Sequence, residues 1–360
     1  MKPSIYKIFI IMLIPVCLPT FAQAQGIRLS EGVHLVMQGS PSLVLNNAGI
    51  INNGNMVTDS GTVAFTGDGS TGPSSIGGNQ PISFYNIRID NSFNGVELDN
   101  DIIVTGSVLM NHGKLQLNNH RLDLGSTGMI SGESNNSFIT GTHGGTIRIL
   151  ALLNAPQAMN PGNIGVELTS KANLGITEII RGHVQQTGNG GETSIQRYFD
   201  IEPELNAGLN ASIRFHYLDH ELGGNSQNEL TLLTSLGKGS SWSAWGKEVN
   251  HGDHSVMENQ LDQLHRFTLA VSMNKAGLYP SVHLYPNPTM DGFTLMLYST
   301  SEKTEVVQLY DHLGHLLERK EWHCQQGTNS IQWNIEKYAA GVYLLRFENP
   351  ALRNLQIVKQ

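Results

Sequence analysis

Short runs in which apolar and polar residues alternate dominate this chain and exclude a helical core. In "GKLQLNN" and "HRLDLG" the apolar residues take every second position, as at Leu115 and Leu117 and again at Leu122 and Leu124. A period of two places one face of a strand in a core and the other in water. Single glycines between the runs, such as Gly113, permit the positive φ that tight turns need. The pattern predicts an all-β protein.

The first part of the chain is predicted to be a β-solenoid-like surface region or a sandwich, over residues 25–170. Its strand-like pieces recur at irregular spacing, so no strict repeat distinguishes the two architectures. Residues 171–275 are predicted to form a middle β-sandwich, because "TSIQRYFDI", "ASIRFHYL", "ELTLLTS" and "HRFTLAVSM" alternate aromatic or β-branched residues with polar ones. A proline-containing linker is expected at residues 276–283.

The first 24 residues are typical of a signal peptide. Lys2 and Lys7 form a positive start, and residues 8–18 form an apolar stretch that is too short to span a bilayer. A lipid-modified Cys17 is disfavoured because "IPV" before it lacks a small residue. The predicted cleavage motif consists of Ala22, Ala24 and Gln25.

Composition excludes several classes of protein. The net charge of −8 gives no basic footprint for nucleic acid, and no later stretch is long and apolar enough to cross a membrane as a helix. Removal of the leader would leave Cys324 as the remaining thiol, so no intrachain disulfide is expected. Stability must then come from strand pairing and burial.

Residues 284–360 are predicted to be a small Ig-like β-sandwich. Pro286 and Pro288 lack a backbone donor and separate this segment from the preceding sheets. "FTLML", "IQWNI", "GVYLLRF" and "LQIVKQ" alternate as strands, and "DHLG" predicts a hairpin turn in which Asp311 bonds the backbone and Gly314 is left-handed.

These motifs, in this order, resemble the type A C-terminal sorting domain of the type IX secretion system, also called the Por secretion system. The resemblance implies that a signal peptide takes the chain through the inner membrane and that the folded tail directs it across the outer membrane. It also implies removal of the tail, with release or attachment to surface lipopolysaccharide by a sortase-like peptidase. The positions that match the family motif are Pro286, Asn287, Pro288, Gly292, Gly314, Gly341 and Lys359.

Candidate catalytic and metal-binding motifs are weak. "HYLDHE" is close to an inverted zinc-protease pattern, but the preceding residues indicate a strand, in which His216 and His220 would lie about 13 Å apart. Two ligands of one zinc ion cannot be so far apart. "NHGDH", with His251, Asp253 and His254, is read as a polar loop. Asp68, Asp99 and Asp101 lack a calcium-loop pattern and are read as solvated turns.

We therefore expect no catalytic, cofactor or metal site. The prediction is a non-catalytic secreted or cell-surface protein of a Gram-negative bacterium, with a structural or adhesive display role. The alternative is a secreted protein that binds or degrades polysaccharide, because solenoids and sandwiches both host such sites. Expected partners are the secretion machinery, the sortase-like peptidase, lipopolysaccharide, and a glycan or cell-surface ligand.

Overall fold

The computed structural model describes residues 26–360 apart from 189–192, 236, 240–241, 245–247, 251–252, 272–281, 300, 326, 351 and 353. The predicted leader, with Ala22, Ala24 and Gln25, and most of the predicted linker lie outside the described residues. The regular structure of the described residues consists of β-strands and short 3-10 turns without any α-helix, which confirms the all-β prediction. No helix long and apolar enough to cross a membrane is found among the described residues.

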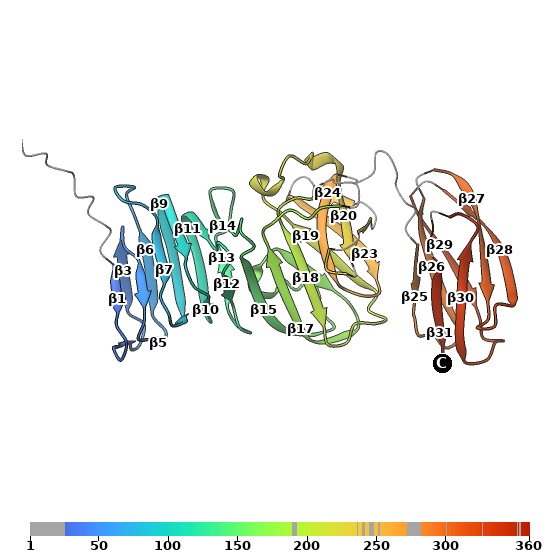
Figure 1. The fold of residues 1–360 in the computed structure, drawn as a ribbon, viewed down its shortest axis with the longest axis horizontal. Helices are drawn as coiled ribbons and strands as arrows, with labels where there is room; N and C mark the ends of the chain where they lie inside the picture. Colours follow the sequence, from blue (N-terminus) through green and yellow to red (C-terminus); the bar gives the residue numbers. More distant parts are fainter. Residues whose placement is uncertain are drawn as a thin grey trace, which may run out of the picture.

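Residues 27–154 coil into a parallel β-solenoid whose strand pairing defines three faces. Its strands run from blue to green in Figure 1. The first face contains β1 (Ile27–Leu29), β4 (Ile50–Asn52), β7 (Ser74–Gly77), the second halves of β9 (Asn86–Leu98) and β11 (Ser107–Gln116), and β14 (Ser137–Thr140). The second contains β2 (His34–Met37), β5 (Asn55–Thr58), β8 (Ile82–Phe84), β10 (Ile102–Val104), β12 (Arg121–Asp123) and β15 (Thr146–Asn154). The third contains β3 (Ser42–Asn46), β6 (Thr62–Thr66), the first halves of β9 and β11, and β13 (Met129–Ser131).

Apolar side chains stack inside the coil in rows that run from turn to turn. Ile82, Ile102 and Leu122 lie in register, and each is at most 1% exposed. Leu115 and Leu117 point inward as their alternation predicts. The architecture of the first region, which the sequence left open, is therefore solenoid-like.

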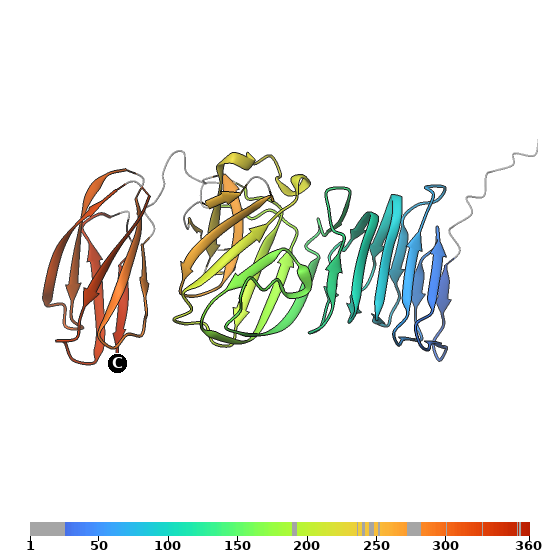
Figure 2. The same cartoon turned by 180° about the vertical axis from the view of Figure 1, so that it is seen from behind.

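The last solenoid strand also begins the middle module. β15 pairs in parallel with β12 on one side and antiparallel with β17 on the other, so the second face continues as one 11-stranded sheet. The added strands are β17 (Asn173–Gly182), β18 (Tyr198–Pro203), β24 (Arg266–Val271), β20 (Leu230–Ser235) and β21 (Ser243–Ala244). Figure 2 shows from behind how the green end of the solenoid adjoins the sandwich.

A second antiparallel sheet packs against this extension. It contains β16 (Val166–Thr169), β19 (Ala211–His216), β23 (Ser255–Leu261) and β22 (Glu248–Asn250). Phe199 and Phe215, one from each sheet, meet edge to face with ring centroids 4.8 Å apart. Short 3-10 turns lie between the strands, namely η1 (Pro161–Asn163), η2 (Asp219–Glu221) and η3 (Gln227–Glu229).

Solenoid and sandwich share one core, which extends from Leu29 to Leu269 without a break. The junction also holds an ion pair between the fully buried Arg181 and the partly buried Glu133. Arg181 on β17 donates two hydrogen bonds to Glu133, between β13 and β14, at 2.5 and 2.7 Å. Burial raises the pKa of Glu133, but the charge and hydrogen bonds of Arg181 outweigh it and lower that pKa to about 2. The predicted boundary at residue 170 thus falls inside a continuous core, and it remains a prediction.

The C-terminal residues form a separate two-sheet sandwich with its own core. One sheet contains β25 (Val282–Tyr285), β26 (Gly292–Ser299) and β29 (Gly327–Asn334). The other contains β28 (Leu316–Cys324), β27 (Lys303–Tyr310), β30 (Gly341–Phe347) and β31 (Leu355–Lys359). The core between them includes Leu295, Leu309, Trp333 and Leu345, each at most 1% exposed. β25 begins at Val282, two residues before the predicted start.

Candidate functional site

The segment Pro286-Asn287-Pro288-Thr289, here called the PNPT segment, joins the two sheets of the C-terminal sandwich. It follows β25 in the first sheet and then runs beside β31 in the second. The backbone N–H of Thr289 donates to Val358 at 2.9 Å, and Gln360 donates back to Thr289 at 2.8 Å. The segment therefore pairs with the last strand of the chain.

Asn287 supplies the backbone pairing that its proline neighbours cannot make. Its side-chain Nδ2 donates to the carbonyl of Gln356 at 2.9 Å, and its Oδ1 accepts from the N–H of Val358 at 2.8 Å. A proline has no N–H, so Pro286 and Pro288 leave gaps in any ladder. The asparagine amide carries one donor and one acceptor group and fills the place of a peptide unit against β31.

A tight turn leads from the PNPT segment into β26. Thr289 Oγ1 donates to the carbonyl of Gly292 and accepts from the N–H of Gly292 at 3.3 Å. A Cβ at Gly292 would come within 2.6 Å of the carbonyl oxygen of Trp333. Glycine is therefore required sterically at this matched motif position. Beside it lies a shallow groove of about 290 Å³, lined by Pro286, Asp291, Gly292, Phe293, Thr294, Gln332, Trp333 and Asn334.

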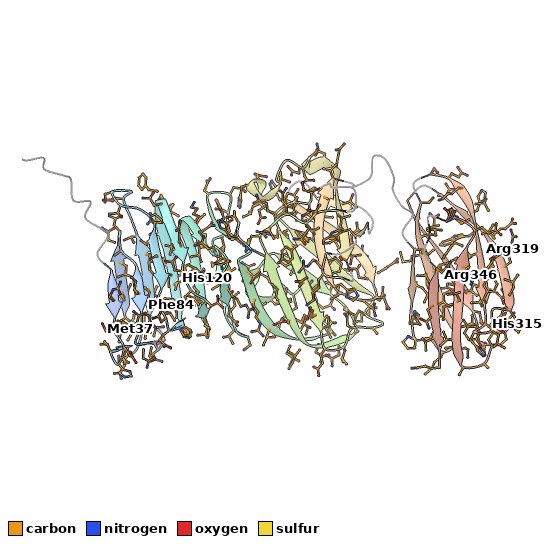
Figure 3. The ribbon with its side chains drawn as sticks, viewed as in Figure 1. Met37, Phe84, His120, His315, Arg319 and Arg346 are labelled. Atoms are coloured by element: carbon orange, nitrogen blue, oxygen red, sulfur yellow. The ribbon has the colours of Figure 1, made fainter. Side chains whose placement is uncertain are left out.

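Gly314 lies in the turn between β27 and β28 with φ of +85°. Asp311 Oδ1 accepts from the N–H groups of Leu313 and His315 at 2.9 and 2.8 Å. The hydrogen bond from the His315 backbone is the main reason that the pKa of Asp311 lies below its usual value. Figure 3 labels His315 at the edge of this sandwich.

Glu318 on β28 forms a side-chain hydrogen bond to β29 in the opposite sheet. Its carboxylate accepts from Trp333 Nε1 at 2.7 Å and Tyr338 OH at 3.0 Å, and Lys337 Nζ lies 2.7 Å away. Partial burial raises the pKa of Glu318, but the hydrogen bonds from Lys337, Tyr338 and Trp333 outweigh it and lower that pKa. Lys320 covers the Trp333 ring with its Nζ 4.2 Å from the centroid.

The motif positions at the two ends of the domain meet through the last strand. Gly341, the first residue of β30, is the register partner of Lys359 on β31. Thr289 forms a parallel bridge to the same Lys359. Pro286, Asn287 and Pro288 therefore lie on one side of β31, and Gly341 lies on the other. Sequence reasoning named these positions, whose functional role stays a prediction, and it missed the side-chain contacts of Asn287.

Residues 283–359 match the family model described as the secretion system C-terminal sorting domain. The tail matches the type IX sorting domain. This family marks proteins that are secreted or displayed on the surface of Gram-negative bacteria, and it implies contact with the type IX secretion machinery. The chain carries a signal for export by that route. No curated protein and no solved structure matches the chain.

Several residues of the weak metal motifs make other contacts, and His251 lies outside the described residues. His216 Nε2 lies 3.1 Å from Glu167, and the buried Glu221 accepts from Arg197 at 2.9 Å. Asp219 lies 3.0 Å from His254. No three His, Cys, Asp or Glu side chains converge as metal ligands within the described ranges.

The structure also shows the surroundings of Asp68 and Cys324, which the sequence analysis named as a turn residue and as the remaining thiol. Asp68 accepts hydrogen bonds from Ser70 and Asn47, which lower its pKa to about 2. Cys324 is buried in the tail, and its burial raises the pKa of the thiol to about 11. A thiol with so high a pKa is a poor nucleophile at neutral pH.

Proposed function

We propose that this chain is a non-catalytic display protein, which the sorting domain delivers to the cell exterior and whose solenoid presents an adhesive surface. Removal of the tail, followed by release or by attachment to lipopolysaccharide through a sortase-like peptidase, belongs to the same proposal. The tail supports export, and the character of the solenoid surface supports display.

The observation that carries the proposal is a row of outward side chains along the 11-stranded sheet. The row follows the strand register, so its members are neighbours from one turn to the next. Its first half consists of Val36, Val57, Ser83 and Ile103. Its second half consists of Asp123, Arg148, Ile180, Asp200 and Arg266.

The two halves of this row differ in whether their side chains form ion pairs within the protein. In the second half, Arg148 lies 2.9 Å from Asp123, and Arg266 lies 2.6 Å from Asp200. In the first half, Val36, Val57 and Ile103, here called the apolar row, are 53, 44 and 38% exposed. An exposed apolar row on a rigid sheet is a surface suited to a ligand.

The test measures binding of the purified exported protein to a glycan array and to whole cells of the producing strain. We expect that V57K combined with I103K reduces binding at least tenfold, because two charges would enter the apolar row. M129K, on an exposed side chain of the third face, should leave binding unchanged. Equal binding by the V57K/I103K and M129K variants would contradict the proposal. Release of reducing sugar from polysaccharides by the unmodified protein would also contradict it.

A further inference from the structure

The first turn of the solenoid is open along its outer side. β1, β2 and β3 pair with β4, β5 and β6 respectively, and none has a second neighbour among the described residues. Unpaired strand edges favour pairing with another chain. The opposite end differs, because β15 continues into the sandwich through β17.

The bonding pattern shows which backbone groups face the open side. The N–H of Asn55 donates to the carbonyl of Val33, just before β2, and the N–H of Asp59 donates to the carbonyl of Met37, the last residue of β2. Successive residues of a parallel strand direct their backbone groups to alternate sides, so the N–H and C=O of Val36 point away from β5. The same reasoning places the backbone groups of Arg28 on β1 and Val44 on β3 at the open edge.

The core is also less covered at this end. Leu29, Met37 and Leu45 are 6 to 8% exposed, whereas Ile50 and Phe65 in the next turn are fully buried. Figure 3 labels Met37 at the outer end of the coil and the buried Phe84 farther in. The apolar Ile27, Leu35 and Leu43 are only half-buried. Solenoids ordinarily need a polar cap over such an end.

Electrostatics permits two such ends to meet. Within residues 26–46, the charged side chains are Arg28 and Glu31, so this turn carries no net charge. The whole chain carries −8. Contact between two first turns therefore adds no net local repulsion to an otherwise acidic molecule.

We propose that the open end is a docking surface for a second copy of the chain, with the two solenoids joined end to end about a two-fold axis. A second copy supplies three edges at the same spacing, and the rotation makes the strand pairs antiparallel. One of the three edge strands pairs with the same strand of the second copy. Each of the other two pairs with the second copy of the other one. Because the sandwich occupies the far end, the contact closes as a dimer and does not grow into a fibre.

The test uses the exported protein, with its ends established by intact mass spectrometry. Light scattering should give twice the mass of one chain. Hydrogen exchange should show protection of the Arg28, Val36 and Val44 amides that disappears on dilution. A monomer at all concentrations up to about 100 µM would overturn the proposal, including a monomer whose open edge is protected by retained residues 1–25.

Paired variants distinguish edge pairing from other contacts. V36P combined with V44P removes two N–H groups from the open edge and should weaken dimerisation at least 100-fold. V36T combined with V44T alters the same exposed side chains but keeps both N–H groups, so it should remain a dimer. A dimeric proline variant would overturn the proposal. If that variant does not fold, as measured by circular dichroism, the amide protection of the unmodified protein decides the question.

Discussion

Asn287 shows how one side chain completes a sheet that two prolines would interrupt. The prolines are visible in the sequence and predict a break between domains, but the role of the asparagine is not visible. Its two partners, Gln356 and Val358, lie 69 and 71 positions later in the chain. Nothing local in "YPNPT" indicates that the segment returns to the last strand. Gly314 differs, because its turn partner Asp311 is only three residues away.

Replacement of Asn287 tests this account at the scale of the residue. N287A removes both hydrogen bonds to β31 and should lower the free energy of unfolding of the tail by about 1–3 kcal/mol. Urea denaturation measures the free energy of unfolding of the tail, and hydrogen exchange measures the protection of the β31 amides. M290A, at an exposed neighbour, serves as the control and should change stability by less than about 0.5 kcal/mol. Equal stability of both variants would show that the Asn287 contacts are unimportant.

Individual solenoid strands follow from local alternation, but their pairing does not. Leu122 and Leu124 alternate with polar residues, and both are buried as expected. The pairing of Leu122 with Ile102 and Ile147 depends on the length of each turn, which is 20 residues on one side and 25 on the other. Alternation alone therefore indicates which face is buried but leaves solenoid and sandwich equally open.

Adjacent residues of β10 provide a matched pair for testing the ladder. Ile102 is 1% exposed inside the coil, whereas Ile103 is 38% exposed in the apolar row. I102A should lower the free energy of unfolding by about 2–5 kcal/mol because it leaves a cavity. I103A should lower it by less than about 1 kcal/mol, since most of that side chain already meets water. Chemical denaturation checks both values, and similar costs would contradict the assigned register.

The whole molecule divides into a joined solenoid and sandwich and a tail with its own core. The joined part shares a continuous sheet and the ion pair between the buried Arg181 and Glu133. The sequence did not indicate this pair, because the two residues are 48 positions apart and neither belongs to a recognisable motif. The tail was predictable because its motifs follow one another in a known order within residues 283–359.

The Arg181–Glu133 pair predicts the acid stability of the joined part. Folding lowers the pKa of Glu133 from 4.5 to about 2, so its contribution is complete above pH 4.5 and is lost as the pH falls towards 2. E133Q should remove this pH dependence and destabilise the protein at pH 7 by about 3 kcal/mol, because Arg181 loses its charged partner. Urea denaturation across this pH range provides the measurement.

E202Q provides the control for that series. Glu202 pairs with Lys238 at the surface and is 47% exposed, so its loss should cost less than about 1 kcal/mol. If the free energy of unfolding of E133Q depends on pH in the same way as that of the unmodified protein, another group governs acid unfolding.

Removal of residues 284–360, followed by cell fractionation, tests most directly whether the tail is a separable address for export. The joined solenoid and sandwich keep their entire core in this truncated chain, so they should remain folded. The account predicts that the truncated protein collects in the periplasm while the full chain reaches the cell surface or the medium. Arrival of the truncated protein outside the cell at the level of the full chain would contradict it.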